Sequence, residues 1–192
     1  DVVVEEGEVY LHGQSGERKA TGTYYTKTRF VEHLLDKSLE PALNDHIERI
    51  DRLREEEGEN AAAEAFFDIR ISDIAMGSGH FLVGAVDRIE TELRAYLTEN
   101  QLTPVEKELD NLKDVAEDAF EGEEYTPNIE RGQLLRRQVA RRCIYGVDLN
   151  PLATELARLS IWVHTFVPGL PLTFLDYNLV SGDSLAGIGT LD

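Results

Sequence analysis

The chain has 192 residues, 42% of them hydrophobic, which is enough for one α/β domain with a core of its own. It carries 37 acidic residues against 19 basic ones, a formal net charge of −18, and a single cysteine. These numbers exclude an internal disulfide and a CxxC metal or redox site, and they disfavour phosphate binding by this stretch alone, since that requires clustered positive charge.

The acidic excess has two compatible explanations. Either a phosphate-binding surface lies in regions beyond this chain, or the source organism is salt-loving and its cytoplasm screens the repulsion, or both hold. No apolar run approaches the roughly 20 residues that span a bilayer, and the N-terminus lacks the pattern of a signal peptide. We therefore expect a cytoplasmic protein without a membrane partner.

Residues 1–60 are predicted to form an N-terminal segment. Alternating apolar and polar residues over 1–13 predict a short hairpin. Apolar residues then recur at three- and four-residue steps from Thr28 to Leu43, which predicts a helix that Pro41 could kink. A charged amphipathic helix is expected to continue over 44–60.

Residues 61–192 are predicted to form the partial core of an α/β fold. The run 66–74 has strand length and β-branched content, and it leads directly into Gly77-Ser78-Gly79 and a long amphipathic helix. Strand, glycine turn and helix make the first half of a βαβ unit. Residues 98–128 interrupt the alternation of strands and helices with an acidic helical insertion. The insertion is either a surface that binds a partner or a segment that is simply exposed to solvent.

Two further strand-to-turn units follow the insertion. A helix is predicted over 129–142, which carries a dense group of arginines, and the strand Ile144–Asp148 ends in an acid. Pro151 begins the next helix, as proline favours the first turn. Alternating apolar residues over 172–180 predict a third strand, which runs into Gly182-Asp183-Ser184.

The glycine turn after the first strand is the first candidate ligand-binding feature. Glycines let the backbone approach a ligand closely, and the N–H groups at a helix start suit an electron-rich partner. Many α/β proteins need such glycines only to turn the chain. A nicotinamide-binding turn has a third glycine where this chain has Leu82, which weakens the interpretation as an NAD-dependent oxidoreductase and leaves it open.

Two carboxylates follow the next strands. Asp148 could accept hydrogen bonds from two ribose hydroxyls, or it could cap the helix that begins at Pro151. Asp183 could accept a bond from an adenine amine, or be an ordinary turn aspartate. Three such features at successive strand ends are improbable by chance, because ligands in open α/β sheets bind outside the carboxyl ends of the strands.

Four segments, in this order, resemble the large adenine-N6 DNA methyltransferases of restriction–modification and phage-defence systems, the type IIG-like group, over roughly residues 17–187. They are Thr21-Gly22-Thr23-Tyr24-Tyr25-Thr26, Ser72-Asp73-Ile74-Ala75-Met76-Gly77-Ser78-Gly79-His80-Phe81-Leu82-Val83, Tyr145-Gly146-Val147-Asp148-Leu149-Asn150-Pro151-Leu152-Ala153 and Ser181-Gly182-Asp183-Ser184-Leu185. The resemblance implies a truncated Rossmann-like methyltransferase fold that binds S-adenosylmethionine (SAM). It also implies DNA as a partner, contacted together with further methyltransferase and target-recognition domains.

The resemblance further assigns nine cofactor-binding residues, with no metal. They are Tyr25, Thr26, Asp73, Ala75, Gly77 and Gly79 around the methionine part of SAM, Asp148 at the ribose, Leu149 beside the adenine and Asp183 at the adenine amine. His80 belongs to the helix start in this family, and a catalytic role for it is not expected.

This chain departs from the family pattern in three places. Ile74 and Met76 replace a usual proline and cysteine, and Lys27 replaces the proline that commonly follows Tyr-Tyr-Thr, which leaves that loop less rigid. The family's catalytic Asn/Asp-Pro-Pro-Tyr/Phe tetrapeptide is not found in the sequence, which ends at Asp192. We therefore expect these residues to bind SAM without methylating DNA. A non-catalytic interaction module of a defence complex, using the acidic helix or the arginines of 131–142, is the second alternative.

Overall fold

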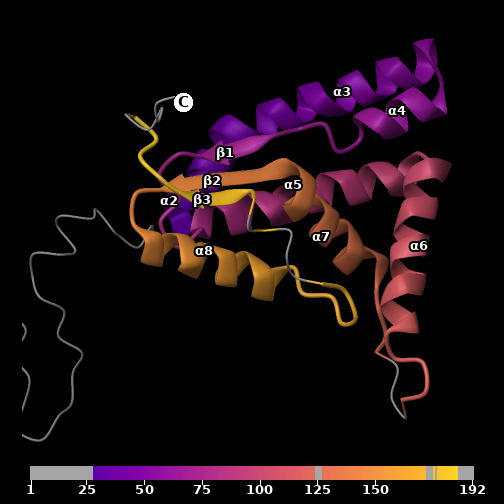
Figure 1. Ribbon diagram of the computed structural model, residues 1–192. Helices are drawn as coiled ribbons and strands as arrows, with labels where there is room; N and C mark the ends of the chain where they lie inside the picture. Colours follow the sequence, from indigo (N-terminus) through magenta and orange to yellow (C-terminus); the bar gives the residue numbers. More distant parts are fainter. Residues whose placement is uncertain (1–27, 124–126, 172–174, 176, 186–192) are drawn as a thin grey trace, which may run out of the picture.

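The computed structural model describes residues 28–123, 127–171, 175 and 177–185, so the expected N-terminal hairpin and Tyr25 and Thr26 lie outside the described residues. The fold is mixed α/β and mostly helical, with a small parallel sheet (Figure 1). Its elements are α2 (Thr28–Leu34), the π-helical turn η1 (Leu35–Leu39), α3 (Glu40–Glu56), α4 (Glu59–Ala65), β1 (Ile71–Asp73), α5 (His80–Glu99), α6 (Thr103–Asp118), α7 (Arg131–Cys143), β2 (Ile144–Asp148), α8 (Pro151–His164) and β3 (Leu179–Ser181).

The three strands are parallel and lie in the order β1-β2-β3. Ile71 pairs with Ile144, and Gly146 pairs with Leu179. Because the strands are parallel, all three end at the same edge of the sheet. The expectation that the strand tips near residues 73, 148 and 183 are neighbours is confirmed.

Gly146 in the central strand lets α5 approach the sheet closely. A Cβ atom at this position would overlap the sulfur of Met76 and lie 2.9 Å from Leu82 Cδ1. Leu82 is fully buried. In dinucleotide-binding turns, the third glycine lies in the helix and allows it to pack closely on the strand. Here the glycine that allows close packing is Gly146 in the strand, and the helix has Leu82 at the corresponding position.

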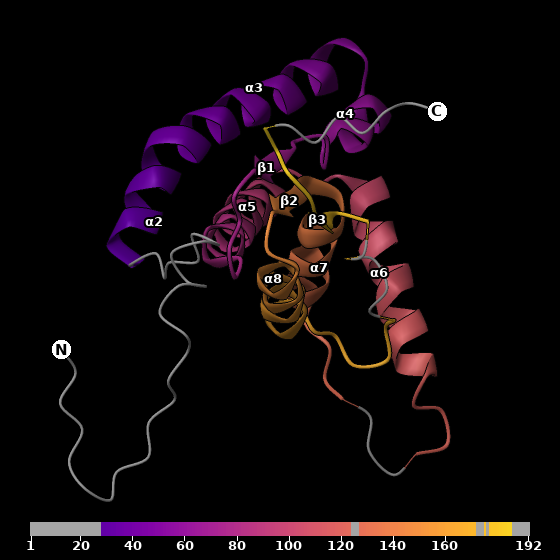
Figure 2. The same cartoon turned by 60° about the vertical axis from the view of Figure 1, so that its left-hand side comes forward.

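Residues 28–56 form one continuous helical path with a widened turn in it (Figure 2). The turn η1 ends at Leu39, two residues before Pro41, and the N–H of Glu40 bonds to the carbonyl of Leu35, five residues earlier. Proline in a regular helix clashes with the carbonyl four residues before it, and a π-helical turn relieves this conflict. The possible kink at Pro41 therefore takes the form of one widened turn.

Two predicted strands are shorter in the structure than the apolar pattern indicated. Within 66–74 only Ile71–Asp73 is a strand, and Phe66 and Phe67 form a buried turn after α4, with their rings edge-to-face at 4.9 Å. The described part of 172–180 joins β3 only from Leu179. Apolar periodicity does not distinguish a strand from a buried connection, and pairing with the short β2 sets the limits.

The predicted insertion 98–128 contains α6, which packs against α4 and α7 at the end of the molecule remote from the strand tips (Figure 1). Val105, Leu109 and Ala116 of α6 belong to one hydrophobic cluster that extends from Val31 to Leu179. The insertion is thus part of the packed core. None of the described helices is long and apolar enough to cross a membrane.

Candidate functional site

The connection from β1 to α5 begins with a carboxylate that folds the chain back on itself. Asp73, the last residue of β1, accepts a hydrogen bond on Oδ1 from the backbone N–H of Ala75 at 3.0 Å. The next residue, Met76, is buried and donates its N–H to the carbonyl of Val147 in β2 at 3.1 Å. These bonds fix the start of the glycine turn above the central strand.

Asp148 joins the turns that follow β1 and β2. Its Oδ2 accepts a bond from the N–H of Gly77 at 2.8 Å, and its Oδ1 accepts one from the N–H of Asn150, also at 2.8 Å. Its backbone carbonyl accepts a bond from Gly182 at 2.9 Å, which extends the pairing toward β3. One residue at the tip of the central strand thus holds all three connections together.

Asp148 does not cap α8, contrary to the alternative interpretation of this residue. Asn150 is the N-cap, and its side chain accepts a bond from Leu152 N at 3.0 Å. The carboxylate of Asp148 instead bonds to the backbone of both turns. A carboxylate oxygen has two lone pairs, so each oxygen retains capacity for a hydroxyl donor.

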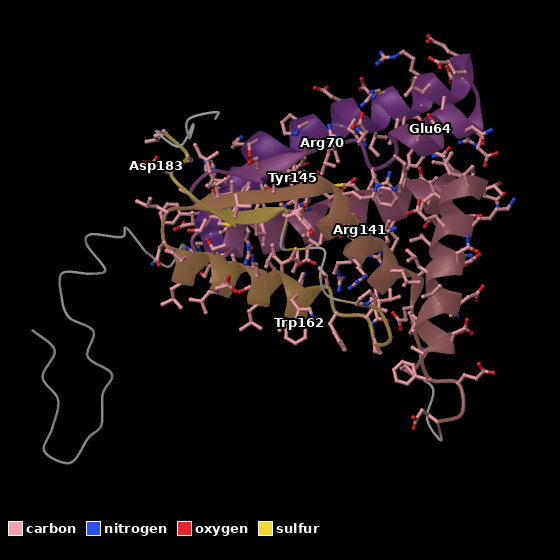
Figure 3. The ribbon with its side chains drawn as sticks, in the orientation of Figure 1. Glu64, Arg70, Arg141, Tyr145, Trp162 and Asp183 are labelled. Atoms are coloured by element: carbon pink, nitrogen blue, oxygen red, sulfur yellow. The ribbon has the colours of Figure 1, made fainter. Side chains whose placement is uncertain are left out.

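Asp183 lies exposed beyond β3, where its Oδ1 accepts a bond from the N–H of Leu185 at 2.9 Å. This is the geometry of a turn aspartate. Figure 3 shows Asp183 past the tip of β3, at the end of the sheet opposite to Arg141. It therefore stands on the same edge as Asp73 and Asp148, and we name these three residues the strand-tip carboxylates.

The charge of Asp148 acts on the neighbouring Asp73. Burial raises the pKa of the Asp73 carboxyl above its ordinary value, and the negative charge of Asp148 raises it further, against the opposing effect of the Ala75 N–H bond. Two acids that share an edge in this way favour a ligand that brings hydroxyl or ammonium donors.

The two glycines of the turn have different structural roles. Gly79, the N-cap residue of α5, has φ +82°, and a Cβ atom there would lie 3.2 Å from the Cα and Cβ atoms of Ala157 in α8. Gly77 has φ +54°, and a Cβ atom there would meet nothing within 4 Å. Gly79 thus permits helix packing, whereas Gly77 leaves open space beside the turn.

Exposed apolar side chains follow the three strands in the sequence, and two of them were not among the predicted site residues. Leu149, which was predicted, is 66% exposed, and the other two, Ile74 and Leu185, follow β1 and β3. Large apolar side chains immediately after predicted strand ends are the sequence signal that could have identified them. Together with the carboxylates they make an edge suited to an aromatic group that carries hydroxyls.

Comparisons with known proteins give one informative match. No family model matches the chain, and no solved structure matches it significantly. A protein of Methanocaldococcus jannaschii, named as a candidate type II restriction enzyme and methyltransferase, is 25% identical over 203 residues. The alignment covers 88% of this chain, and the chain spans only 15% of the length of that relative. The chain is therefore related to a protein of restriction–modification type.

The structure brings together all the predicted site residues that it describes. Asp73, Ala75, Gly77 and Gly79 belong to one connection, Asp148 and Leu149 to the next and Asp183 to the third, at one edge of the sheet. Their assignment to parts of SAM stays a prediction.

His80 lies beside a different hollow. A cavity of about 270 Å³ between α5 and α8 is lined by Ser78, His80, Val83, Ser160, Val163 and His164. His80 Nδ1 lies 3.0 Å from Ser78 Oγ, which agrees with its expected place at the helix start. Neither Asp148 nor Asp183 lines this cavity, so it is distinct from the hollow that the strand tips would offer to a ligand.

Proposed function

We propose that this chain is the SAM-binding part of a DNA adenine-N6 methyltransferase of restriction–modification type. The observation that carries the proposal is the bond from the Gly77 N–H to Asp148, which joins the glycine turn to the acid of the neighbouring strand. The relationship to a restriction–modification protein supports a DNA-modifying enzyme in general. The proposal adds the cofactor, the residues that hold it and the adenine specificity that the four motifs imply.

The residues at the strand tips fit the chemistry of an adenosyl cofactor. Asp148 would accept from the ribose hydroxyls, and the exposed Leu149 would pack against the adenine ring. Asp73 would face the ammonium group of the methionine part across the open space beside Gly77. Bound there, SAM would supply an activated methyl group for transfer to an amine nitrogen.

In the whole protein we propose that the methyl acceptor is an adenine turned out of the DNA helix. Within these 192 residues there is no Asn-Pro-Pro-aromatic tetrapeptide of the kind that would hold its amino group. We therefore expect the chain to bind SAM and to transfer no methyl group to DNA. Radiolabelled SAM, incubated with the chain and adenine-containing DNA, tests this, and incorporation of label into DNA would contradict it.

Titration calorimetry with SAM and with its demethylated product is the direct test of cofactor binding. Asp148→Ala removes the ribose acceptor, and a lost hydrogen bond to a charged group costs about 1–3 kcal/mol, so we expect affinity to fall roughly 5- to 150-fold. Asp114→Ala, which alters an exposed carboxylate on α6, is the matched control and should bind as the parent chain does.

Asp148 also holds two turns, so the melting temperature of each variant must accompany the titration. A variant that remains folded at the assay temperature and binds SAM as tightly as the parent would reject the proposed ribose contact. A parent chain that is stabilised by NAD and not by SAM would reject the methyltransferase assignment in favour of an oxidoreductase.

The interaction-module alternative receives little support from the arginines of α7. Arg131 Nη2 donates to both carboxylate oxygens of Asp110 of α6, at 2.7 and 2.9 Å, and Arg142 lies 3.4 Å from Glu108 of the same helix. The acidic helix and the basic helix thus pair within the chain, which reduces the charge that either offers to a partner.

A further inference from the structure

Helix α8 carries apolar side chains on two opposite faces. Ala153, Ala157 and Ile161 face the sheet and α5 and are buried. On the opposite face lies a second apolar row, which we name the outer stripe: Leu152, Leu156, Leu159, Val163 and, just beyond the helix, Phe166. These five are 43–67% exposed. A helix that is apolar on both sides normally has both sides covered.

The helix that carries the outer stripe has no formal net charge, although the chain is strongly acidic. The formally charged residues of α8 are Glu155 and Arg158, which form an ion pair at 2.7 Å. Arg158 also donates to the carbonyl of Leu179, at 3.0 Å from Nε and 2.7 Å from Nη2, which holds it against β3. The chain as a whole carries a charge of −18, so a second copy meets less repulsion at α8 than the average surface presents.

The spacing of the outer stripe is self-complementary. Leu152 lies seven residues before Leu159 and Phe166 seven residues after it, while Leu156 and Val163 lie three before and four after. In an antiparallel pair of such helices with a two-fold axis at Leu159, each end of one stripe meets the opposite end of the other. This is the condition for an isologous contact, in which the same surface serves on both copies.

We propose that the outer stripe of α8 binds the outer stripe of a second copy of this chain, in an antiparallel two-fold pair centred on Leu159. Covering the five side chains on both copies removes on the order of 1,000 Å² from water, which is near the minimum for a specific interface. The cavity between α5 and α8 is lined by Ser160 and His164. In the antiparallel pair, Leu156 of the second copy lies opposite the helix between these two residues. The cavity volume of about 270 Å³ accepts a side chain of that size.

Sedimentation of the full chain as a function of concentration tests the proposal. We expect a species of twice the monomer mass, and at least a tenfold weaker dimer for Leu159→Glu, because the two introduced carboxylates would face each other across the axis. Val115→Glu on α6, where the parent side chain is 56% exposed, is the matched control and should dimerise as the parent does. A parent chain that is monomeric at all concentrations, or a dimer that survives Leu159→Glu, would overturn the proposal.

Disulfide trapping tests the antiparallel geometry and does not depend on the stability of a charged variant. Leu159→Cys should cross-link to itself under mild oxidation, because the axis brings the two positions together. Leu152→Cys and Phe166→Cys should each cross-link poorly alone and efficiently when mixed, since like ends are separated by about 21 Å along the helix axis. The native Cys143 is buried, which raises its pKa to about 12 and keeps it from competing. Self-cross-linking of Leu152→Cys, or equal yields in every combination, would overturn the pairing.

Discussion

At the scale of single residues, the strand-tip carboxylates combine structural and proposed binding roles. Asp148 uses both carboxylate oxygens to hold backbone N–H groups of the two adjacent turns. Asp73 uses one oxygen for its own turn and is partly removed from water. Removing Asp148 should therefore loosen the site, whereas changing Asp73 should mainly relieve an electrostatic cost.

We predict that Asp73→Asn stabilises the folded chain and weakens SAM binding. Burial and the nearby charge of Asp148 raise the pKa of Asp73, so ionising this carboxyl costs folding free energy. The cost is absent below the unfolded-state pKa, where Asp73 is protonated in both states, and is fully present above the raised folded-state pKa. Asparagine keeps the Oδ1 acceptor for the Ala75 N–H.

Melting curves at acid and neutral pH measure this effect. The melting temperature of Asp73→Asn should exceed that of the parent by a few degrees at neutral pH, and the difference should shrink as the pH falls through the raised pKa. SAM affinity should decrease in the same variant, which is the trade-off expected where binding needs a desolvated charge. A variant that is less stable than the parent at neutral pH would show that the charge of Asp73 is stabilising.

Among the helices and strands, α6 is the one whose role in the structure differs most from the role that its sequence predicted. Its acidic composition predicted a solvated excursion or a partner surface. In the structure one side of α6 packs Val105 and Leu109 into the common core, and its acids pair with arginines of α7. A Cβ atom at Gly169 would overlap the carbonyl of Ala116, so the connection after α8 also lies directly against this helix.

Truncating Leu109 tests whether α6 is integral to the fold. Leu109 is 2% exposed, and Leu109→Ala should cost about 2–5 kcal/mol, because it deletes buried methyl groups and leaves a cavity. In a chain of this size the melting temperature should fall by roughly 5–15 °C. Val115→Ala, on the exposed side of the same helix, should change stability by less than about 0.5 kcal/mol. Equal behaviour of the two variants would mean that α6 can detach without affecting the core.

At the scale of the whole molecule, charge is the dominant feature of the surface. The ion pairs between α5, α6 and α7 use acids from two helices to balance the arginines of the third. The excess of acid nevertheless remains, and like charges on a compact chain repel one another. Added salt shortens the range of this repulsion from about 10 Å at 0.1 M to about 3 Å at 1 M.

We predict that molar KCl raises the melting temperature of the chain above its value in dilute buffer. Exposed ion pairs lose little when salt screens them, because each contributes only about 0–1 kcal/mol. The matched control is the same comparison near pH 4.6, the isoelectric point, where the net charge and therefore the salt effect should largely disappear. A melting temperature that falls in KCl at neutral pH would show that attractive pairs outweigh the net repulsion, and would argue against a salt-adapted source.

The sequence by itself determined the local features of this protein. It predicted the strand Ile144–Asp148, the helix that begins at Pro151 and the glycine turn before α5, because side-chain periodicity, proline and glycine act within a few residues. It also placed an acid at the end of the first two strands and just after the third, in the correct order. Tertiary structure decided where β1 and β3 begin, since strands exist only where a partner strand pairs with them.

Tertiary structure also decided which residues carry the connections at the strand tips. Nothing local to Gly146 indicates that it makes room for Met76 and Leu82, and nothing local to Asp148 indicates that it bonds to Gly77, 71 residues away. These contacts depend on how the helices and strands pack against each other. The acidic helix α6 is part of the core for the same reason. A side chain is buried only if another surface packs against it, and the sequence of a helix describes that helix without showing which surface it meets.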